Sequence, residues 1–279
     1  MKKMRLLCLA LAAMVAVAGL SACGQEKKDQ KPAADKKVQL KVYAAASMTE
    51  TMKEIADKYQ KAHPNVEIIY NFDSSGTLKT QIQNGADCDI FISAAQKQMN
   101  QLDAKDTTTN KDKLDFIASD TRVNLLENKV VLVTPEGNVK GIKDFKDMAE
   151  KLQAGSIKLV MGNSDVPVGQ YTQKILKFFN LNEQELANSG VISYGSNVKE
   201  VTTQVKEGSA DCGVVYATDA FSAKLQPLDQ ATKEMCGQVI YPAAVLKNSK
   251  NQEEAKAFLK YLQGEEAMQI FAKVGFSKV

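Results

Sequence analysis

The chain has 279 residues, of which 44% are hydrophobic and 25% charged, with a formal net charge of +3. The first 37 positions hold eight basic but only three acidic residues, so the rest of the chain is slightly acidic. No basic run with interleaved aromatic residues is present, which argues against nucleic-acid binding. The remaining length is enough for two compact lobes, each with a core of its own.

The first residues carry the pattern of an export signal. A basic start precedes an apolar run from Leu6 to Leu20, shorter than the roughly 20 residues that a membrane span needs. The ending Leu-Ser-Ala-Cys, closed by Cys23, resembles the bacterial lipobox. We therefore expect a lipoprotein signal peptide over residues 1–22, lipidation of Cys23 and a location on the extracytoplasmic face of the cell membrane. A plain secretory signal or an uncleaved anchor is the alternative.

Residues 23–37 are rich in Lys, Gln and Asp and show no apolar pattern, so they predict a flexible tether. After the tether, short apolar runs alternate with amphipathic helices. We expect strands over 38–43, 66–72 and 89–93, each followed by a helix. The first of these helices ends at His63-Pro64, and we expect this single histidine to serve a turn. The βαβα alternation predicts a parallel sheet covered by helices on both faces.

A Val/Leu strand over 130–134 is expected to cross into a second lobe. Further strands are predicted over 157–161, 192–194 and 213–216, with helices that begin near Pro167 and Asn197. A strand over 239–246 is expected to return to the first lobe, and two helices complete the chain.

Three cysteines lie beyond the tether, at positions 88, 212 and 236. Three is an odd number, and no two have the spacing of a metal site. One disulfide with one free thiol is one interpretation, and three unpaired buried thiols is the other. We favour the second, and we expect no direct side-chain ligand for a metal ion.

Four of the predicted helices begin at small or capping residues directly after a strand. The four starts are Ser47, which forms a Ser-x-x-Glu capping box with Glu50, then Ser74-Ser75-Gly76, Pro167-Val168 and Asn197-Val198. A helix start offers unpaired N–H groups and the positive end of the helix dipole. In an α/β fold such turns lie at the carboxyl ends of the strands, where ligands bind. Ordinary capping explains any one of them, but the four together predict a cleft that favours anions.

Six stretches carry a resemblance to a known family, and they are spread in order over the whole body: 42–47, 72–78, 89–94, 166–169, 213–216 and 274–276. They resemble the molybdate-binding proteins of bacterial ABC importers. The resemblance implies an α/β, two-lobed periplasmic-binding-protein-like fold (type II), with two doubly wound sheets joined by a two-strand hinge. We accordingly expect one lobe over 38–127 and 246–279, and the other over 128–245.

The resemblance also implies a function. It implies a monomeric binding protein, not an enzyme, whose ligand is molybdate or tungstate and which needs no cofactor. Such a protein delivers the ion to an ABC permease driven by a cytoplasmic ATPase. The resemblance places five residues on the oxyanion: Ser47, Ser75, Val168, Val198 and Tyr216. The serines would act through hydroxyl and N–H groups, the valines through N–H and the tyrosine through its hydroxyl, so molybdenum is held only through its oxygens. Two positions depart from the family, since Val168 replaces a common Ala and Gly76 a frequent Ser.

This donor set suits the implied ligand. Molybdate and tungstate are unprotonated dianions near neutral pH, which accept hydrogen bonds and donate none. Phosphate carries a proton that such a site would leave unpaired. Sulfate differs from molybdate only in size. Asp165 lies near the predicted cleft, and a carboxylate there could expand the coordination of the metal beyond tetrahedral, so both coordination states stay open.

Three alternatives stay open at this point. The first is a protein of the same fold that binds sulfate, phosphate or an organic acid. The second is a secreted serine hydrolase that uses Ser47 or Ser75, against which stand the position of His63 and the lack of a Gly-x-Ser-x-Gly motif. The third is a lipoprotein adhesin or receptor domain without a small ligand.

Overall fold

The computed structural model describes residues 37–279. The expected signal peptide, the lipidation site at Cys23 and nearly all of the tether lie outside this range. None of the helices in the described part of the chain has the length and apolar character that a bilayer span requires.

The first of two sheets has six strands in the order β11-β4-β10-β3-β1-β2. Strands β1, β2 and β3 are parallel, whereas β10 is antiparallel to both β3 and β4. Strands β3 and β10 are apolar and buried along their whole length, as expected of a sheet that helices cover on both sides. The bounds are β1 Val38–Ala45, β2 Val66–Asp73, β3 Ile90–Ile92, β4 Val123–Asn128, β10 Val239–Val245 and β11 Ser277–Lys278.

The second sheet has five strands in the order β7-β6-β8-β5-β9. Strand β6 is parallel to β7 and β8, and β5 is antiparallel to β8 and β9. The bounds are β5 Val130–Val133, β6 Leu159–Gly162, β7 Ile192–Gly195, β8 Cys212–Tyr216 and β9 Pro227–Gln230.

Each sheet and its helices form one lobe, and the fold is α/β and two-lobed, as predicted. In the first lobe the helices are η1 Ala46–Met48, α1 Thr49–Ala62, α2 Ser75–Gln83, α3 Gln96–Leu102, α10 Gln252–Leu262 and α11 Glu265–Lys273. In the second lobe they are α4 Phe145–Gln153, α5 Pro167–Phe178, α6 Glu183–Asn188, α7 Val198–Lys206, α8 Ala217–Ala223 and α9 Lys233–Cys236.

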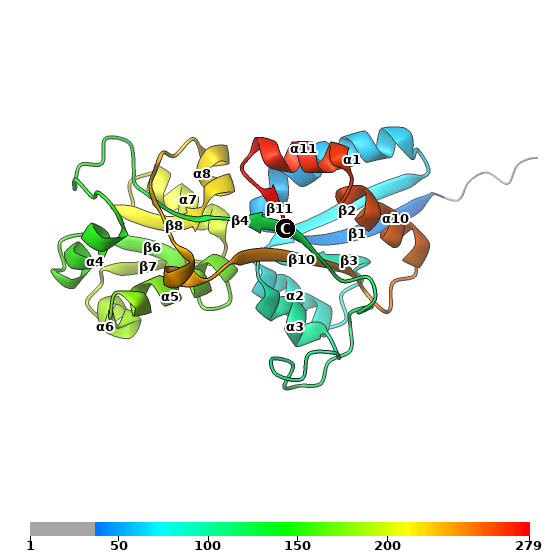
Figure 1. Ribbon diagram of the computed structural model, residues 1–279, viewed down its shortest axis with the longest axis horizontal. Coiled ribbons are helices and arrows are strands. Elements are labelled where there is room, and N and C mark those ends of the chain that lie inside the picture. Colours follow the sequence, from blue (N-terminus) through cyan, green and yellow to red (C-terminus); the bar gives the residue numbers. More distant parts are fainter. Residues whose placement is uncertain (1–36) are drawn as a thin grey trace, which may run out of the picture. The chain divides into compact units, whose positions relative to one another are not determined.

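The chain passes between the sheets twice. The first passage is the single residue Lys129 between β4 and β5, and the second is the segment from β9 through α9 to β10. Strands β4 and β10 lie side by side in the region between the lobes (Figure 1) and pair in antiparallel fashion. Since β10 pairs within the first sheet from Val239 onward, the pairing favours a second passage near Gln238, earlier than the expected division at 245/246.

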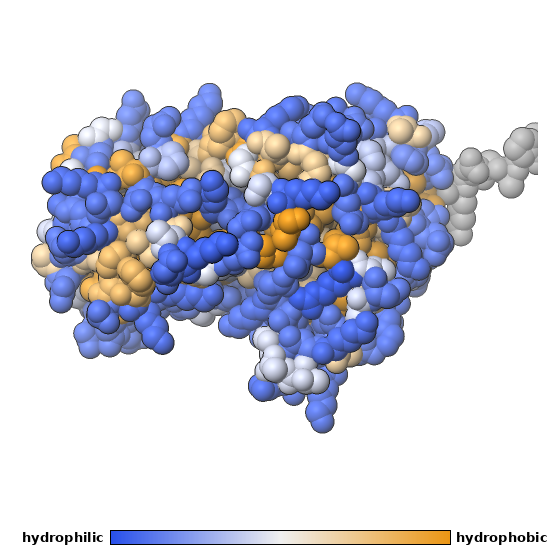
Figure 2. Space-filling model, in the orientation of Figure 1, coloured by the Kyte–Doolittle hydropathy of each residue, from blue (hydrophilic) through white to orange (hydrophobic). Residues whose placement is uncertain are grey.

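The face of the molecule in Figure 2 is largely hydrophilic. Large apolar side chains that are exposed come from separate elements, for example Phe178 on α5 and Phe221 on α8. Isolated apolar residues of this kind are ordinary on a protein surface, so they do not define a docking face.

One local expectation was wrong. Helix α1 begins at Thr49 with Met48 as its N-cap, and no side chain caps it. The Ser47 hydroxyl instead contacts Tyr241 at 2.9 Å, and Glu50 pairs with Lys199. The capping box between Ser47 and Glu50 therefore does not form, because both side chains have partners elsewhere in the fold.

Candidate functional site

A small cavity lies between helix starts of the two lobes, and all five residues expected to bind the ligand line it. Its volume is about 10 Å³, the scale of one water-sized group, so any larger ligand requires the lobes to move apart. The lining residues are Ala45, Ala46, Ser47, Asp73, Ser74, Ser75, Ala94, Val166, Pro167, Val168, Val198 and Tyr216.

The first lobe contributes two buried serines. Ser47 lies in η1 directly after β1, and Ser75 is the first residue of α2, which Ser74 caps by accepting a hydrogen bond from the Thr77 N–H. The Ser75 Oγ in turn accepts a hydrogen bond from the Ala94 N–H at 2.9 Å. That bond fixes the Ser75 side chain and leaves its own proton free to donate.

The second lobe contributes two helix starts. Pro167 is the first residue of α5 and Val168 the second, while Val198 is the first residue of α7. Asn197 caps α7 by accepting hydrogen bonds from the N–H groups of Lys199 and Glu200, as the sequence predicted. The N–H groups of Val168 and Val198 precede the first intrahelical hydrogen bond of their helices, so they are free to donate to an anion.

Tyr216 ends β8 and is the N-cap residue of α8. Its hydroxyl oxygen is fully buried and has no hydrogen-bond partner among residues 37–279. Burial raises the pKa of this phenol well above its usual value, which keeps it protonated as a donor. A buried donor without a partner is costly, and it marks a place where a ligand can satisfy the protein.

Gly76 explains how closely the lobes approach each other. A Cβ at this position would lie 2.2 Å from the carbonyl oxygen of Asp165, which belongs to the loop before α5 in the opposite lobe. The frequent serine of the family therefore has no room here. The side chain of Asp165 is exposed and does not line the cavity.

A buried polar network behind the cavity was not foreseen. The Asn128 Nδ2 donates to the Thr218 Oγ1 at 3.0 Å and to the Tyr241 Oη at 3.2 Å, and Tyr241 contacts Ser47. The only sequence signal was Pro242 inside a predicted central strand, where proline marks an irregularity. The register of β10 against β4 does shift between Tyr241 and Pro242.

The charges around the cavity are few. Asp73 is the one acidic lining residue, and its Oδ1 accepts a hydrogen bond from the Ser74 N–H at 2.7 Å. No lysine or arginine lines the cavity, so hydrogen-bond donors and helix dipoles, and not a cationic side chain, attract an anion there. This arrangement avoids the desolvation cost of a buried cation.

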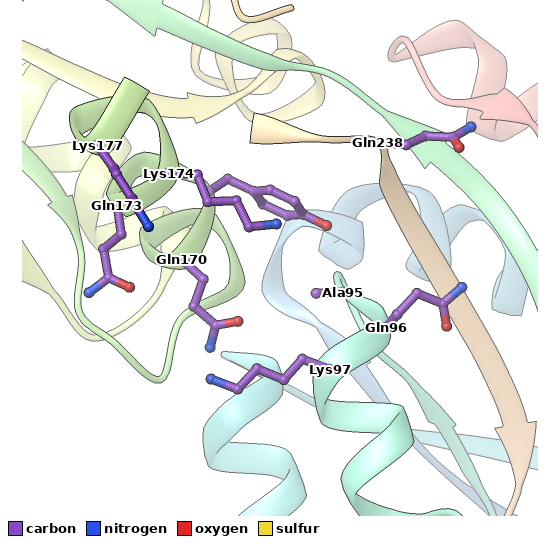
Figure 3. A pocket seen from close by; sticks show the side chains of 9 residues that line it. Ala95, Gln96, Lys97, Gln170, Gln173, Lys174, Lys177 and Gln238 are labelled. Carbon is purple, nitrogen blue, oxygen red and sulfur yellow. The ribbon is translucent and has the colours of Figure 1, made fainter. Parts of the chain in front are cut away.

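A groove of about 430 Å³ lies beside the cavity, between α3 of the first lobe and α5 of the second (Figure 3). Lys97 on α3 and Gln170 on α5 extend toward each other across it, and Lys174 and Lys177 lie on the α5 side. Tyr171, another lining residue, packs its ring edge against Tyr216, with ring centroids 6.3 Å apart. The groove thus reaches the wall of the cavity.

Other residues singled out in the sequence lie away from this site. Cys88, Cys212 and Cys236 are free and buried, as we favoured. His63 is the C-cap residue of α1, and its ring stacks on Tyr59. No group of three or more His, Cys, Asp or Glu side chains within residues 37–279 is placed to hold a metal ion.

Comparison with known proteins gives a consistent result over the whole described body. The family model described as bacterial extracellular solute-binding protein matches residues 40–277. YvgL of Bacillus subtilis, whose name is that of a candidate ABC transporter substrate-binding lipoprotein, is 34% identical over 99% of this chain and 98% of its own.

Two further relatives carry names that refer to molybdenum. The molybdate-binding protein ModA of Haemophilus influenzae is 32% identical over 85% of this chain and 89% of its own. The solved substrate-binding domain of a candidate molybdenum ABC transporter from Clostridium difficile is 33% identical, with a TM-score of 0.62. It covers 86% of this chain and 99% of that one. The similarity extends over both lobes and over all four helix starts.

Proposed function

Because the chain belongs to the bacterial extracellular solute-binding protein family, we propose that it captures molybdate, or tungstate, between its two lobes. Its relatives are extracytoplasmic substrate-binding components of ABC transporters and not enzymes. The hydrolase alternative is therefore wrong, in keeping with the place of His63 at the C-terminal end of α1, whereas Ser47 precedes that helix.

One observation carries the proposal. Ser47, Ser75, Val168, Val198 and Tyr216, drawn from both lobes, line one cavity that offers donors and contains no lysine or arginine. A dianion that only accepts hydrogen bonds matches such a site. The names of the Haemophilus and Clostridium relatives support molybdate as that dianion.

We also propose how the ion is delivered. Ligand bound from both sides stabilises the closed form, since only that form satisfies it completely. The closed protein would then dock on an ABC permease driven by a cytoplasmic ATPase. Lipidation of Cys23 would hold it at the outer face of the membrane, for which the name of the Bacillus relative is the support. The lobes would divide near residue 128 and near residues 238–245.

Calorimetry with molybdate, tungstate and sulfate tests the proposed ligand. We expect tight binding of molybdate or tungstate. Sulfate is the second candidate because it presents the same charge and the same acceptors, so micromolar sulfate binding without molybdate binding would overturn the choice of ion.

Two variants test the residues. Ser75→Ala and Tyr216→Phe each remove one donor to a charged ligand, and each should raise the Kd for molybdate about tenfold or more. Ser189→Ala and Tyr194→Phe are matched controls, because their hydroxyls donate to Leu186 and Glu183 outside the cavity. Unchanged affinity in both site variants would contradict the assigned site.

A further inference from the structure

A chain of hydrogen bonds runs from the passage between the lobes to the cavity, and its direction can be determined. The backbone N–H of Lys129 donates to the Asn128 side-chain oxygen at 2.8 Å. Only the oxygen of an amide can accept this bond. The Asn128 nitrogen must therefore be the atom that faces Tyr241 and Thr218, and toward both it is a donor.

The direction continues through Tyr241. Its hydroxyl oxygen accepts from Asn128 and therefore needs an acceptor for its own proton. Among the described residues, the Ser47 Oγ at 2.9 Å is the acceptor within hydrogen-bonding distance. Tyr241 is fully buried, so leaving that proton unpaired would be costly. Tyr241 accordingly donates to Ser47.

This direction decides what Ser47 can offer a ligand. A hydroxyl has one proton, and the Ser47 proton is not used toward Tyr241, so it is free to point into the cavity. The Ser75 hydroxyl is placed in the same way. Its Oγ accepts a hydrogen bond from the Ala94 N–H, so its own proton is free as well. The Tyr216 hydroxyl has no partner at all among residues 37–279. Ser47, Ser75 and Tyr216 thus each keep a proton that is free to donate to a ligand in the cavity.

We propose that Tyr241 and Asn128 are positioning residues that hold Ser47 as a donor, and so make the site select unprotonated oxyanions over protonated ones. The inference rests on the proposed function. It adds the cause of selectivity, which lies in residues that do not touch the ion. Asp73 is the one carboxylate that lines the cavity, and its Oδ1 accepts a hydrogen bond from the Ser74 N–H.

Phosphate is the probe that shows whether the Ser47 hydroxyl donates to or accepts from the ligand, because near neutral pH phosphate always carries a proton. Tyr241→Phe removes the donor to Ser47 and lets the serine hydroxyl rotate. We expect the Kd for molybdate to rise about tenfold and the ratio of the phosphate Kd to the molybdate Kd to fall. Tyr70→Phe is the matched control, since this partly buried tyrosine donates to the Met52 carbonyl in the first lobe and should leave the ratio unchanged.

Asn128→Asp is a second, nearly isosteric variant, and it reverses the direction of the hydrogen bonds that lead to Ser47. One carboxylate oxygen still accepts from the Lys129 N–H, while the other accepts from Tyr241. Tyr241 then accepts from Ser47, whose lone pairs turn to the cavity. The added charge repels molybdate and hydrogen phosphate, both dianions, to a similar extent. The ratio of the phosphate Kd to the molybdate Kd therefore reports the hydrogen-bond direction at Ser47 apart from the added charge, and we expect this ratio to fall again.

Calorimetric titrations of wild type, both variants and the control with molybdate and phosphate complete the test, with far-UV circular dichroism to establish folding. If wild type binds molybdate but the ratio is unchanged in whichever of Tyr241→Phe and Asn128→Asp folds, the inference is overturned and the proposed function stands. If wild type binds neither anion, the proposed function is overturned and the inference with it.

Discussion

Lys199 in the second lobe forms an ion pair with Glu50 in the first, with its Nζ 3.0 Å from the Oε1 and 2.9 Å from the Oε2. Both residues lie close in sequence to residues that line the cavity. Val198 directly precedes Lys199, and Ser47 lies three residues before Glu50. The same ammonium lies 3.2 Å from the buried carboxylate of Asp219. Burial lowers the pKa of Lys199, but the carboxylates of Asp219 and Glu50 raise it to a greater extent.

The Glu50–Lys199 pair should stabilise the closed form. Glu50→Gln removes a half-exposed ion pair, worth up to about 1 kcal/mol, so we expect the molybdate Kd to rise about two- to fivefold. Calorimetry measures this change, and small-angle X-ray scattering of the ligand-free protein should show a larger radius of gyration.

Glu54→Gln is the control for this prediction. Glu54 lies on the same helix, α1, and its partner Lys273 is in the same lobe, with 3.0 Å between the charged atoms. Its loss should leave the Kd unchanged. An equal rise in Kd for both variants would show that the Glu50 pair does not act between the lobes.

Asp219 should make stability depend on pH. Burial raises the pKa of its carboxyl to about 6, against the opposing effect of Lys199. The folded protein then holds this proton at pH values where the unfolded chain has lost it. The contribution of Asp219 to the free energy of unfolding therefore falls as pH rises between about 4 and 6, by on the order of 2 kcal/mol.

Asp219→Asn removes this titration. Urea unfolding at pH 4, 5, 6 and 7 should show the stability of wild type relative to Asp219→Asn decreasing with pH up to about 6 and then levelling off. Lys199 stays protonated over this range and adds only a constant offset. A difference that does not vary with pH would mean that Asp219 is already ionised at pH 4.

Gly76 should be required for closure and not for folding. In Gly76→Ala the new Cβ would lie 2.2 Å from the Asp165 carbonyl oxygen across the cleft, so the lobes must stay apart. We expect the molybdate Kd to rise at least about tenfold with little change in the melting temperature of the ligand-free protein.

Gly264→Ala is the comparison for this variant. Gly264 lies at a helix start too, as the N-cap residue of α11, and has an ordinary φ of −77°. Its nearest neighbour, the Tyr261 carbonyl oxygen, would be 3.1 Å from the new Cβ and lies in the same lobe. This variant should bind molybdate normally. Normal binding by Gly76→Ala would show that the cleft tolerates a side chain there.

The alternation of strands and helices was predictable because buried parallel strands are short apolar runs, as in Ile90–Ile92 and Cys212–Tyr216. The caps at Ser74 and Asn197 were predictable because a cap is satisfied within a few residues. Strand β4 was missed, since Val123–Asn128 contains polar residues and reads as a loop.

Contacts across long distances in the chain were not predictable in this way. Ser47 and Glu50 fit a local capping box, yet their partners Tyr241 and Lys199 are 194 and 149 residues away. Local patterns therefore pointed to the helix starts at the cavity, and the family resemblance added Tyr216. The hydrogen-bond network that orients those residues depends on the packing of both lobes, which no local pattern records.

The lysines of the groove should speed capture of the anion. Lys97 on α3 and Lys177 on α5 line it (Figure 3), and no carboxylate of residues 37–279 is paired with either. Positive charge at the mouth of a cleft raises the local concentration of a dianion and its association rate.

Lys97→Gln with Lys177→Gln should lower the association rate constant for molybdate several-fold at low ionic strength, with less effect at physiological ionic strength. The dissociation rate constant should stay the same, because neither lysine lines the cavity. Lys61→Gln with Lys206→Gln removes the same charge at the C-terminal turns of α1 and α7. Stopped-flow kinetics on the two double variants separates local steering from net charge, and equal slowing in both would rule out a role for the groove.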